Sequence, residues 1–353
     1  MSLLFACGGG GGSSSEDSQG TTKSLENLVL EDYNLKECIT ERAGELGWLT
    51  IEDVDNLDCS NRGVNSLEGI EVFLNLTSLN LQGNYFLNNI TPIEAFSKLK
   101  ELNLLDVGSI ELDPVSKLSE LSKISLGSSR WIPFFLGESV DITPLQNLTN
   151  LVSLSIQNEE LSDLTKLMNL GNLVELDVKG NRIEDISFLS RMDKLQILNL
   201  RGNRISDVSV ISGLLELRSL DIGNNPSYFI DELMLAQGNK ITDISFLVGL
   251  EYLEELFISN SGISSADMFS SMDNLVLLDL QWNSIEDVAP LAELTNLEVL
   301  KLTENSIDSI ESLGSLTRLQ ELLVSGNNIT DVSVLRGMLN MKILNIGSNP
   351  ISD

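Results

Sequence analysis

The sequence predicts a curved α/β repeat solenoid, with a parallel β-sheet on its concave face and short 3₁₀ or irregular segments on its convex face. Two observations lead to this prediction. A 22-residue pattern of apolar positions repeats along most of the 353-residue chain, and the composition is 42 % apolar with only 5 % aromatic residues. A core of Leu, Ile and Val that is divided among many short repeats is typical of stacked coils, each of which contacts only its neighbours.

Residues 1–24 are interpreted as a lipid-anchored, flexible tether. The motif Leu-Phe-Ala-Cys that ends at Cys7 resembles a bacterial lipobox, in which the cysteine becomes the lipidated N-terminus. The Gly and Ser run that follows it cannot bury apolar surface and behaves as a flexible coil. Only six residues precede Cys7, so the interpretation treats the signal peptide as truncated. The alternative is a disordered tail that contains one cysteine.

Residues 25–53 are expected to form an N-terminal helical cap. Apolar residues fall at helical spacing between residues 25 and 46 and give one apolar stripe. They are Leu35, Cys38, Ile39, Ala43 and Leu46. An amphipathic helix here would cover the open end of the first coil.

A disulfide bond between Cys38 and Cys59 is expected to join the cap to the first repeat. Cys38 lies on the apolar face of the predicted helix, and Cys59 occupies an inward strand position of the first repeat copy. The alternative is a pair of buried free thiols. A disulfide would require an oxidising compartment.

The repeat domain spans residues 54–353 in 13 copies. Each copy carries apolar residues at template positions 1, 4 and 6, an Asn at position 9, and apolar residues at positions 11, 14 and 17. One copy reads Leu173, Leu176, Val178, Asn181, Ile183, Ile186 and Leu189. The copies start at residues 54, 76, 99, 121, 151, 173, 195, 217, 253, 275, 297, 319 and 341, and nine of the 12 intervals are 22 residues long.

Each part of the template predicts a local structure. Leu-x-x-Leu-x-Leu puts the last two leucines on the same side of a short strand. The Asn amide can bond the backbone of the neighbouring coil, which otherwise has no partner once it is buried. The three-residue period that follows suits a 3₁₀-like return segment. One copy buries too little apolar surface to offset its ordering entropy, so the copies must stack.

This pattern resembles the leucine-rich repeat, specifically the 22-residue class of the internalins of bacterial pathogens and of phosphatase-1 regulatory subunits. The resemblance implies a curved right-handed coil whose concave strand face binds another macromolecule. It covers about 300 of the 353 residues. The Asn ladder is interrupted in five copies, by Arg62, Val107, Ser129, Glu159 and Ser261. No polar cap follows the last copy, so its inner face is expected to be exposed.

Composition argues against several function classes. The chain has 22 Lys and Arg against 52 Asp and Glu, a net charge of −30, and this charge repels nucleic acid. It has no His, which removes His-based nucleophile pairs, general bases and metal ligands. No phosphate loop, dinucleotide motif or run of 18 apolar residues is present. We therefore expect no catalysis, no cofactor, no metal and no membrane-spanning helix.

A C-terminal part of the concave face is the first candidate for partner binding. Small polar residues fill most outward strand positions, but apolar residues occupy four of them on successive strands, with Trp282 and Lys301 beside them. The four are Phe257, Leu277, Val299 and Leu323. Contiguous exposed apolar area usually marks a contact surface. The alternative is that a flanking loop shelters it.

A polar column on the preceding repeats is interpreted as a salt-bridge lattice. Asp177, Asn199 and Asp221 stack on neighbouring strands, with Lys179 and Arg201 one position along. Stacked carboxylates could suggest calcium, but no calcium-binding loop is present. The adjacent cations neutralise the column, and exposed pairs of this kind contribute little stability.

Two insertions interrupt the repeat, near residues 130–139 and 226–238. Both follow a strand at the Asn position, so both should leave from the same edge of the solenoid, which is often the binding face. They contain five aromatic residues, which we expect to act as interface anchors. These are Trp131, Phe134, Phe135, Tyr228 and Phe229. The alternative is that the insertions fold back over the interrupted ladder.

The sequence therefore predicts a non-catalytic protein-binding module, anchored as a lipoprotein to the outer membrane or surface of a bacterium. Its concave face would bind a protein ligand, with a glycan as a further possibility, in adhesion or host interaction. It would contact the membrane only through its N-terminal lipid. The alternative is a cytoplasmic scaffold that regulates a phosphatase or a similar enzyme. Repeat folds of this kind serve too many functions for the fold alone to decide.

Overall fold

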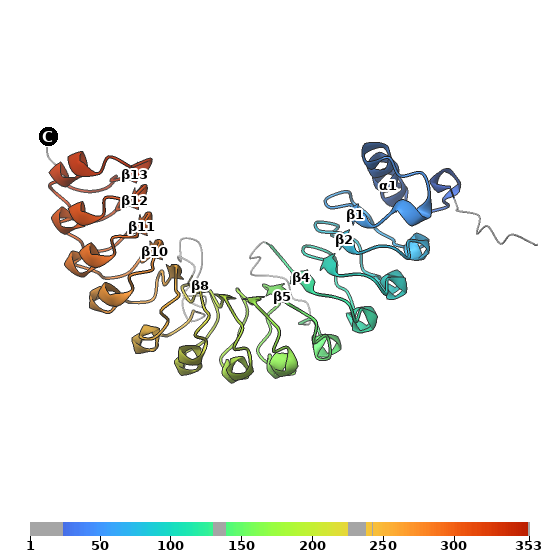
Figure 1. The fold of residues 1–353 in the computed structure, drawn as a ribbon, viewed down its shortest axis with the longest axis horizontal. Helices are drawn as coiled ribbons and strands as arrows, with labels where there is room; N and C mark the ends of the chain where they lie inside the picture. Colours follow the sequence, from blue (N-terminus) through green and yellow to red (C-terminus); the bar gives the residue numbers. More distant parts are fainter. Residues whose placement is uncertain (1–23, 130–138, 225–237, 242, 352–353) are drawn as a thin grey trace, which may run out of the picture.

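The computed structural model describes residues 24–129, 139–224, 238–241 and 243–351. It confirms the predicted solenoid: 13 parallel strands form one sheet in chain order. Figure 1 shows an open arc with the strands on its inner side, the 3₁₀ segments on its outer side and helix α1 (Tyr33–Leu46) at its N-terminal end.

The strands recur once in each coil. They are β1 (Asn56–Asp58), β2 (Ser78–Asn80), β3 (Glu101–Asn103), β4 (Lys123–Gly127), β5 (Ser153–Gln157), β6 (Glu175–Asp177), β7 (Ile197–Asn199), β8 (Ser219–Asp221), β9 (Glu255–Phe257), β10 (Leu277–Asp279), β11 (Val299–Lys301), β12 (Glu321–Leu323) and β13 (Ile343–Asn345). Equivalent template positions pair from strand to strand, as Leu176 pairs with Leu198.

Short 3₁₀ segments form the outer side of the coils and part of the cap. They are η1 (Leu25–Asn27), η2 (Ile51–Asp53), η3 (Ile70–Val72), η4 (Thr91–Ala95), η5 (Asp113–Lys117), η6 (Thr143–Leu145), η7 (Thr165–Asn169), η8 (Ser187–Arg191), η9 (Ser209–Gly213), η10 (Ser245–Leu247), η11 (Asp267–Ser271), η12 (Ala289–Glu293), η13 (Glu311–Ser315) and η14 (Ser333–Gly337). Their three-residue hydrogen-bond period matches the spacing of their apolar residues.

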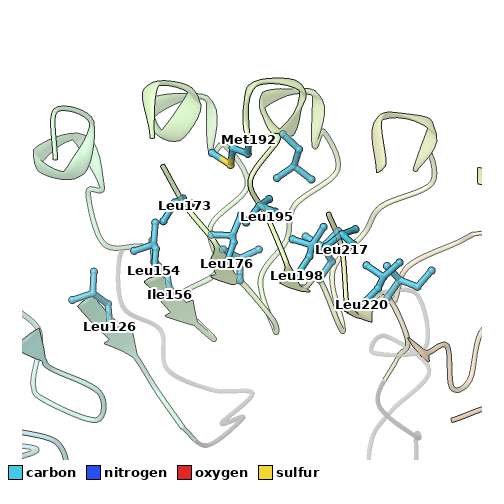
Figure 2. Packing of buried hydrophobic residues seen from close by; sticks show 14 of the residues in the cluster. Leu126, Leu154, Ile156, Leu173, Leu176, Met192, Leu195, Leu198, Leu217 and Leu220 are labelled. Atoms are coloured by element: carbon cyan, nitrogen blue, oxygen red, sulfur yellow. The ribbon is translucent and has the colours of Figure 1, made fainter. Parts of the chain in front are cut away.

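The core is one continuous stack of leucines between the sheet and the outer segments. Figure 2 shows Leu154, Leu176, Leu198 and Leu220 side by side on successive coils, and none is more than 1 % exposed. Each inner coil is therefore covered on both sides by the same template residues of its neighbours, so its burial depends on them.

A ladder of buried and half-buried asparagines links the coils after most of the strands. Asn203 shows the pattern: its Oδ1 accepts the Ile183 N–H at 3.1 Å, and its Nδ2 donates to the carbonyls of Val178 at 3.0 Å and Leu200 at 2.9 Å. Among the described residues the same arrangement is made by Asn84, Asn181, Asn239, Asn283, Asn305, Asn327 and Asn349. The eighth copy takes its ladder residue from Asn239, beyond the second insertion.

The ladder is interrupted between the third and fifth copies, and other groups replace it there. The buried Asp106 carboxylate accepts the Ser129 N–H at 2.9 Å and the Ser128 hydroxyl at 3.0 Å. Strands β4 and β5 extend to five residues each and pair over their whole length. A cavity of about 70 Å³ remains, and burial raises the pKa of Glu159, which lines it.

The N-terminal cap is present, and its helix begins at Tyr33. Asp32 is the N-cap residue: one carboxylate oxygen accepts the Leu35 N–H at 2.8 Å, and the other accepts the Asn65 N–H at 2.7 Å. The same side chain thus starts the helix and holds it against the first coil. Leu46, expected on the apolar stripe, is 51 % exposed because it is the last residue of the helix.

The structure joins Cys38 to Cys59 by a disulfide bond, which links α1 to the first coil. At the other end, Leu344 is 42 % exposed, whereas Leu322 at the same template position of the preceding coil is fully buried. Leu344 thus has less cover than the equivalent leucine of the preceding coil.

We predict that the Asn203→Ala variant lowers the free energy of unfolding by about 3 kcal/mol, because one buried N–H and two buried carbonyls lose their partner. The matched control is Asn172→Ala, which removes an exposed amide that donates to the Thr149 carbonyl at 2.9 Å and should cost less than about 1 kcal/mol. Urea denaturation measures both. Equal losses would contradict a stabilising role of the buried ladder.

Candidate partner-binding face

The apolar residues singled out on the concave face lie on strands β9 to β12 and form what we call the C-terminal patch. It consists of Phe257, Leu277, Val299 and Leu323. Leu277 pairs directly with Val299, while Phe257 and Leu323 lie in the adjacent column of the sheet, three strands apart. All four side chains are half-buried. The patch is thus a bent band, with its two ends in one column of the sheet and its middle in the adjacent column.

Two charged residues separate the ends of this band. Asp279 is 6 % exposed, and its carboxylate accepts the Gln281 backbone N–H at 3.1 Å and the side-chain amide at 3.1 and 3.2 Å. Lys301 Nζ lies 4.0 Å from the Glu321 carboxylate. Since these charges have partners within the chain, the apolar side chains are the groups of this region that gain most from an external contact.

Trp282 lies where the chain leaves β10 at the edge of the patch. Its backbone is in the left-handed region, with φ of 53°, and its N–H donates to the Thr303 carbonyl at 2.8 Å. Its side chain is half-buried. The hydrogen bond from Trp282 to Thr303 of the next coil therefore fixes the backbone position of Trp282.

The polar column on β6 to β8 forms a network closed within the chain. Arg201 Nε donates to Asp221 at 2.8 Å, and its other nitrogens donate to the Asn224 carbonyl and the Ser259 hydroxyl at 2.8 and 2.9 Å. Gln157 donates to Asp177 at 2.7 Å, and Lys179 lies 3.8 Å from the same carboxylate. Within the part of the chain that the structure describes, no cluster of three or more His, Cys, Asp or Glu could hold a metal ion.

Carboxylates on the two sides of the solenoid differ in their pKa. Burial raises the pKa of Asp177 and of Asp221 above the ordinary value of 3.8, although Lys179 and Arg201 act in the opposite direction. On the convex side, aspartates that precede the 3₁₀ segments accept a backbone N–H, as Asp185 does from Ser187 at 2.8 Å. This hydrogen bond lowers the pKa of Asp185.

The aromatic residues of the insertions lie outside the described residues, as does Cys7. They are Trp131, Phe134, Phe135, Tyr228 and Phe229. The base of the second insertion is described: Asn224 Oδ1 accepts the Asn239 N–H at 2.7 Å, and its Nδ2 donates to the Asn239 carbonyl at 3.1 Å. The two ends of that insertion are thus held together at the edge where the strands end.

Two exposed aromatic residues at this edge were not predicted from the sequence. Tyr85 and Phe86 follow Asn84 in the second copy and are 53 % and 77 % exposed. The interval from the second to the third copy is 23 residues instead of 22, and this extra residue was the available signal.

Comparisons with known protein families show the class of repeat to which the chain belongs. A family model described as "Leucine Rich repeats (2 copies)" matches residues 317–353, and one described as "Leucine Rich repeat" matches residues 193–212. With its 13-stranded parallel sheet, the chain is a leucine-rich repeat protein. A comparison with curated protein sequences gave no match.

Similar solved structures show which kind of leucine-rich repeat protein this chain resembles. An internalin (inlF) from Listeria monocytogenes is 26 % identical, with 94 % of this chain and 93 % of that chain covered and a TM-score of 0.71. Internalin C2 of the same species is 30 % identical, with 56 % and 83 % covered and a TM-score of 0.50. A leucine-rich repeat protein of Leptospira interrogans shares the fold at 22 % identity, with 88 % and 81 % covered and a TM-score of 0.60. The chain belongs to the internalin-like leucine-rich repeat proteins.

We predict opposite stability changes for two Asp→Asn variants at pH 7. Because the pKa of Asp177 is raised in the folded state, its charge opposes folding above that pKa, and Asp177→Asn should stabilise the protein. Because the pKa of Asp185 is lowered, its charge favours folding above pH 3.8, and Asp185→Asn should destabilise it. The Asp177 effect should disappear as the pH falls through its raised pKa toward 3.8, whereas the Asp185 effect should shrink only as the pH falls below 3.8. Denaturation from pH 7 to pH 3 measures them, and changes of the same sign would refute the assignment.

Proposed function

We propose that this protein is a non-catalytic binding module whose concave face recognises a protein partner, with the C-terminal patch at the centre of the contact. The proposal rests on the difference between the polar side chains of β6 to β8 and the apolar side chains of β9 to β12. The polar column of β6 to β8 is closed by its own hydrogen bonds, whereas the four apolar residues of the patch stand on a concave strand face. Contiguous apolar area on a protein surface usually marks a contact site, and a few desolvated residues near the centre of an interface supply most of its binding energy.

Trp282 and the insertions extend the proposed contact toward the edge where the strands end. The aromatic residues of the insertions supply large contact areas at a small cost in side-chain entropy, which suits interface anchors. The closed base at Asn224 and Asn239 supports this part of the proposal, because it fixes where the second insertion leaves the solenoid.

Rigidity is the proposed mechanism of recognition. The sheet pays its ordering entropy when the coils fold, so little conformational freedom remains to be lost on binding. The interlocked strand register and the Asn ladder hold the outward side chains at fixed spacing. A partner that matches this spacing would bind without rearrangement of the solenoid.

We further propose that the protein acts at a bacterial surface, anchored through a lipid on Cys7, in adhesion or host interaction. The Cys38–Cys59 disulfide supports an oxidising compartment, and internalin-like relatives support a role in host contact. No helix of the described residues is long and apolar enough to cross a bilayer. The alternative, a cytoplasmic scaffold for a phosphatase, requires free thiols and no lipid. Mass spectrometry of Cys7, Cys38 and Cys59 from native cells distinguishes the two.

We predict that the double variant Phe257→Asp, Leu323→Asp lowers capture of host-cell proteins by the immobilised chain at least about tenfold, because two charges must then be desolvated at the contact. The matched control is Val152→Asp, Leu215→Asp, which changes two exposed aliphatic residues, 43 % and 54 % accessible, away from the patch. Thermal unfolding checks that both variants fold. Unchanged capture by the patch variant would remove the patch as the site.

A further inference from the structure

A stretch that begins at the end of the first coil and covers most of the second carries no charged side chain. The 22 consecutive residues from Val72 to Ile93 contain no Asp, Glu, Lys or Arg, although charged residues make up 21 % of the chain. Five asparagines, one glutamine and several hydroxyl side chains take their place: Asn75, Asn80, Asn84, Asn88, Asn89, Gln82, Thr77, Ser78 and Thr91. This stretch therefore offers hydrogen bonds without electrostatic attraction for a charged partner, and the charged residues of the second coil, Glu94 and Lys98, follow it.

The same coil exposes two aromatic side chains. Asn84 occupies its usual ladder position, where its Oδ1 accepts the Val64 N–H at 2.8 Å. In regular copies the residue two positions after the ladder Asn is apolar and buried. In this copy the buried residue is Leu87, which lies three positions after Asn84. The extra residue turns Tyr85 and Phe86 outward, and we call this pair the aromatic bulge.

The backbone of the aromatic bulge is fixed by its neighbours. The Leu87 N–H donates to the Asn84 carbonyl at 3.0 Å, and the Gly108 N–H of the next coil donates to the Leu87 carbonyl at 2.9 Å. A Cβ atom at Gly108 would lie 2.7 Å from the Leu87 oxygen and 3.0 Å from the Tyr85 oxygen, so a glycine is required there. The two rings are thus presented by an ordered turn.

Two charged groups of the adjacent coils have partners within the chain. Asp106 of the third coil is 7 % exposed and accepts hydrogen bonds from Ser128 and Ser129. Arg62 of the first coil lies 2.7 Å from the Glu41 carboxylate of α1. Exposed amides lie nearby: Asn88 follows the bulge in the sequence, and Asn61 belongs to the first coil.

We propose that the aromatic bulge is a binding site for a neutral glycan. An aromatic ring offers a flat apolar surface with a negative face, on which the C–H groups of a sugar ring can pack. Amide side chains both donate and accept hydrogen bonds, and this matches the hydroxyl groups of a neutral sugar. A charged glycan or a charged peptide would find no opposite charge to pair with in the stretch from Val72 to Ile93. The site is separate from the C-terminal patch and does not depend on the function proposed for it.

The test is binding of the full chain to immobilised neutral oligosaccharides of glucose, galactose, mannose and N-acetylglucosamine, with sialylated and sulfated oligosaccharides for comparison. At least one neutral series should bind, and Tyr85→Ala, Phe86→Ala should weaken that binding by about tenfold or more. The matched control is Tyr252→Ala, because Tyr252 is also 53 % exposed but lies on another part of the solenoid. This control should leave binding unchanged.

Several outcomes would overturn the proposal. They are binding of charged oligosaccharides only, binding of no neutral oligosaccharide, and neutral binding that the bulge variant leaves intact. Loss of protein capture in the bulge variant, without neutral sugar binding, would make the bulge a protein contact instead. The Phe257→Asp, Leu323→Asp variant should keep its sugar binding. Thermal unfolding of each variant shows that a loss of binding is not a loss of fold.

Discussion

Each coil of this solenoid depends on its neighbours for two things that it cannot supply itself: cover for its apolar side chains and partners for its buried backbone groups. Leu176 and Leu198 pack on each other across the register, and Asn203 reaches back to the carbonyl of Val178 and the N–H of Ile183. Stacking therefore fixes every template position in a column. The concave face consists of such columns, and its chemistry changes along the arc only where the outward residues change.

Function follows from the departures from the template. Where the columns are regular and polar, as at Asp177 and Asp221, the side chains satisfy one another. Where apolar residues replace them, at Phe257 to Leu323, the face retains capacity for an external contact. Where one residue is added, at Tyr85 and Phe86, aromatic rings leave the core and face solvent. The interrupted Asn ladder illustrates the cost of a departure, because Asp106 and the longer strands β4 and β5 must replace its hydrogen bonds.

The repeat was sufficient to predict the sheet, the outer 3₁₀ segments and the Asn ladder, because their partners recur at fixed template positions of successive coils. The helical spacing of apolar residues before the repeat predicted the capping helix. Features that depend on distant residues were less accessible. Asn239 supplies the ladder residue of the eighth coil because the two ends of the second insertion meet, where the Asn239 N–H donates to Asn224 Oδ1. The bent shape of the C-terminal patch became clear from the register of β9 to β12. Tyr85 and Phe86 resembled ordinary template residues until the one-residue shift showed that Leu87 occupies the buried position.

Site-resolved amide hydrogen exchange tests the central claim that the coils are held by their neighbours. The N–H groups of Ile183, Ile205 and Ile307 lie in segments without regular secondary structure, and each donates to the ladder Asn of the next coil at 3.0 or 3.1 Å. The account predicts that they exchange as slowly as the amides of the β-sheet, because they open only when stacked coils separate. Exchange as fast as that of exposed loop amides would contradict it.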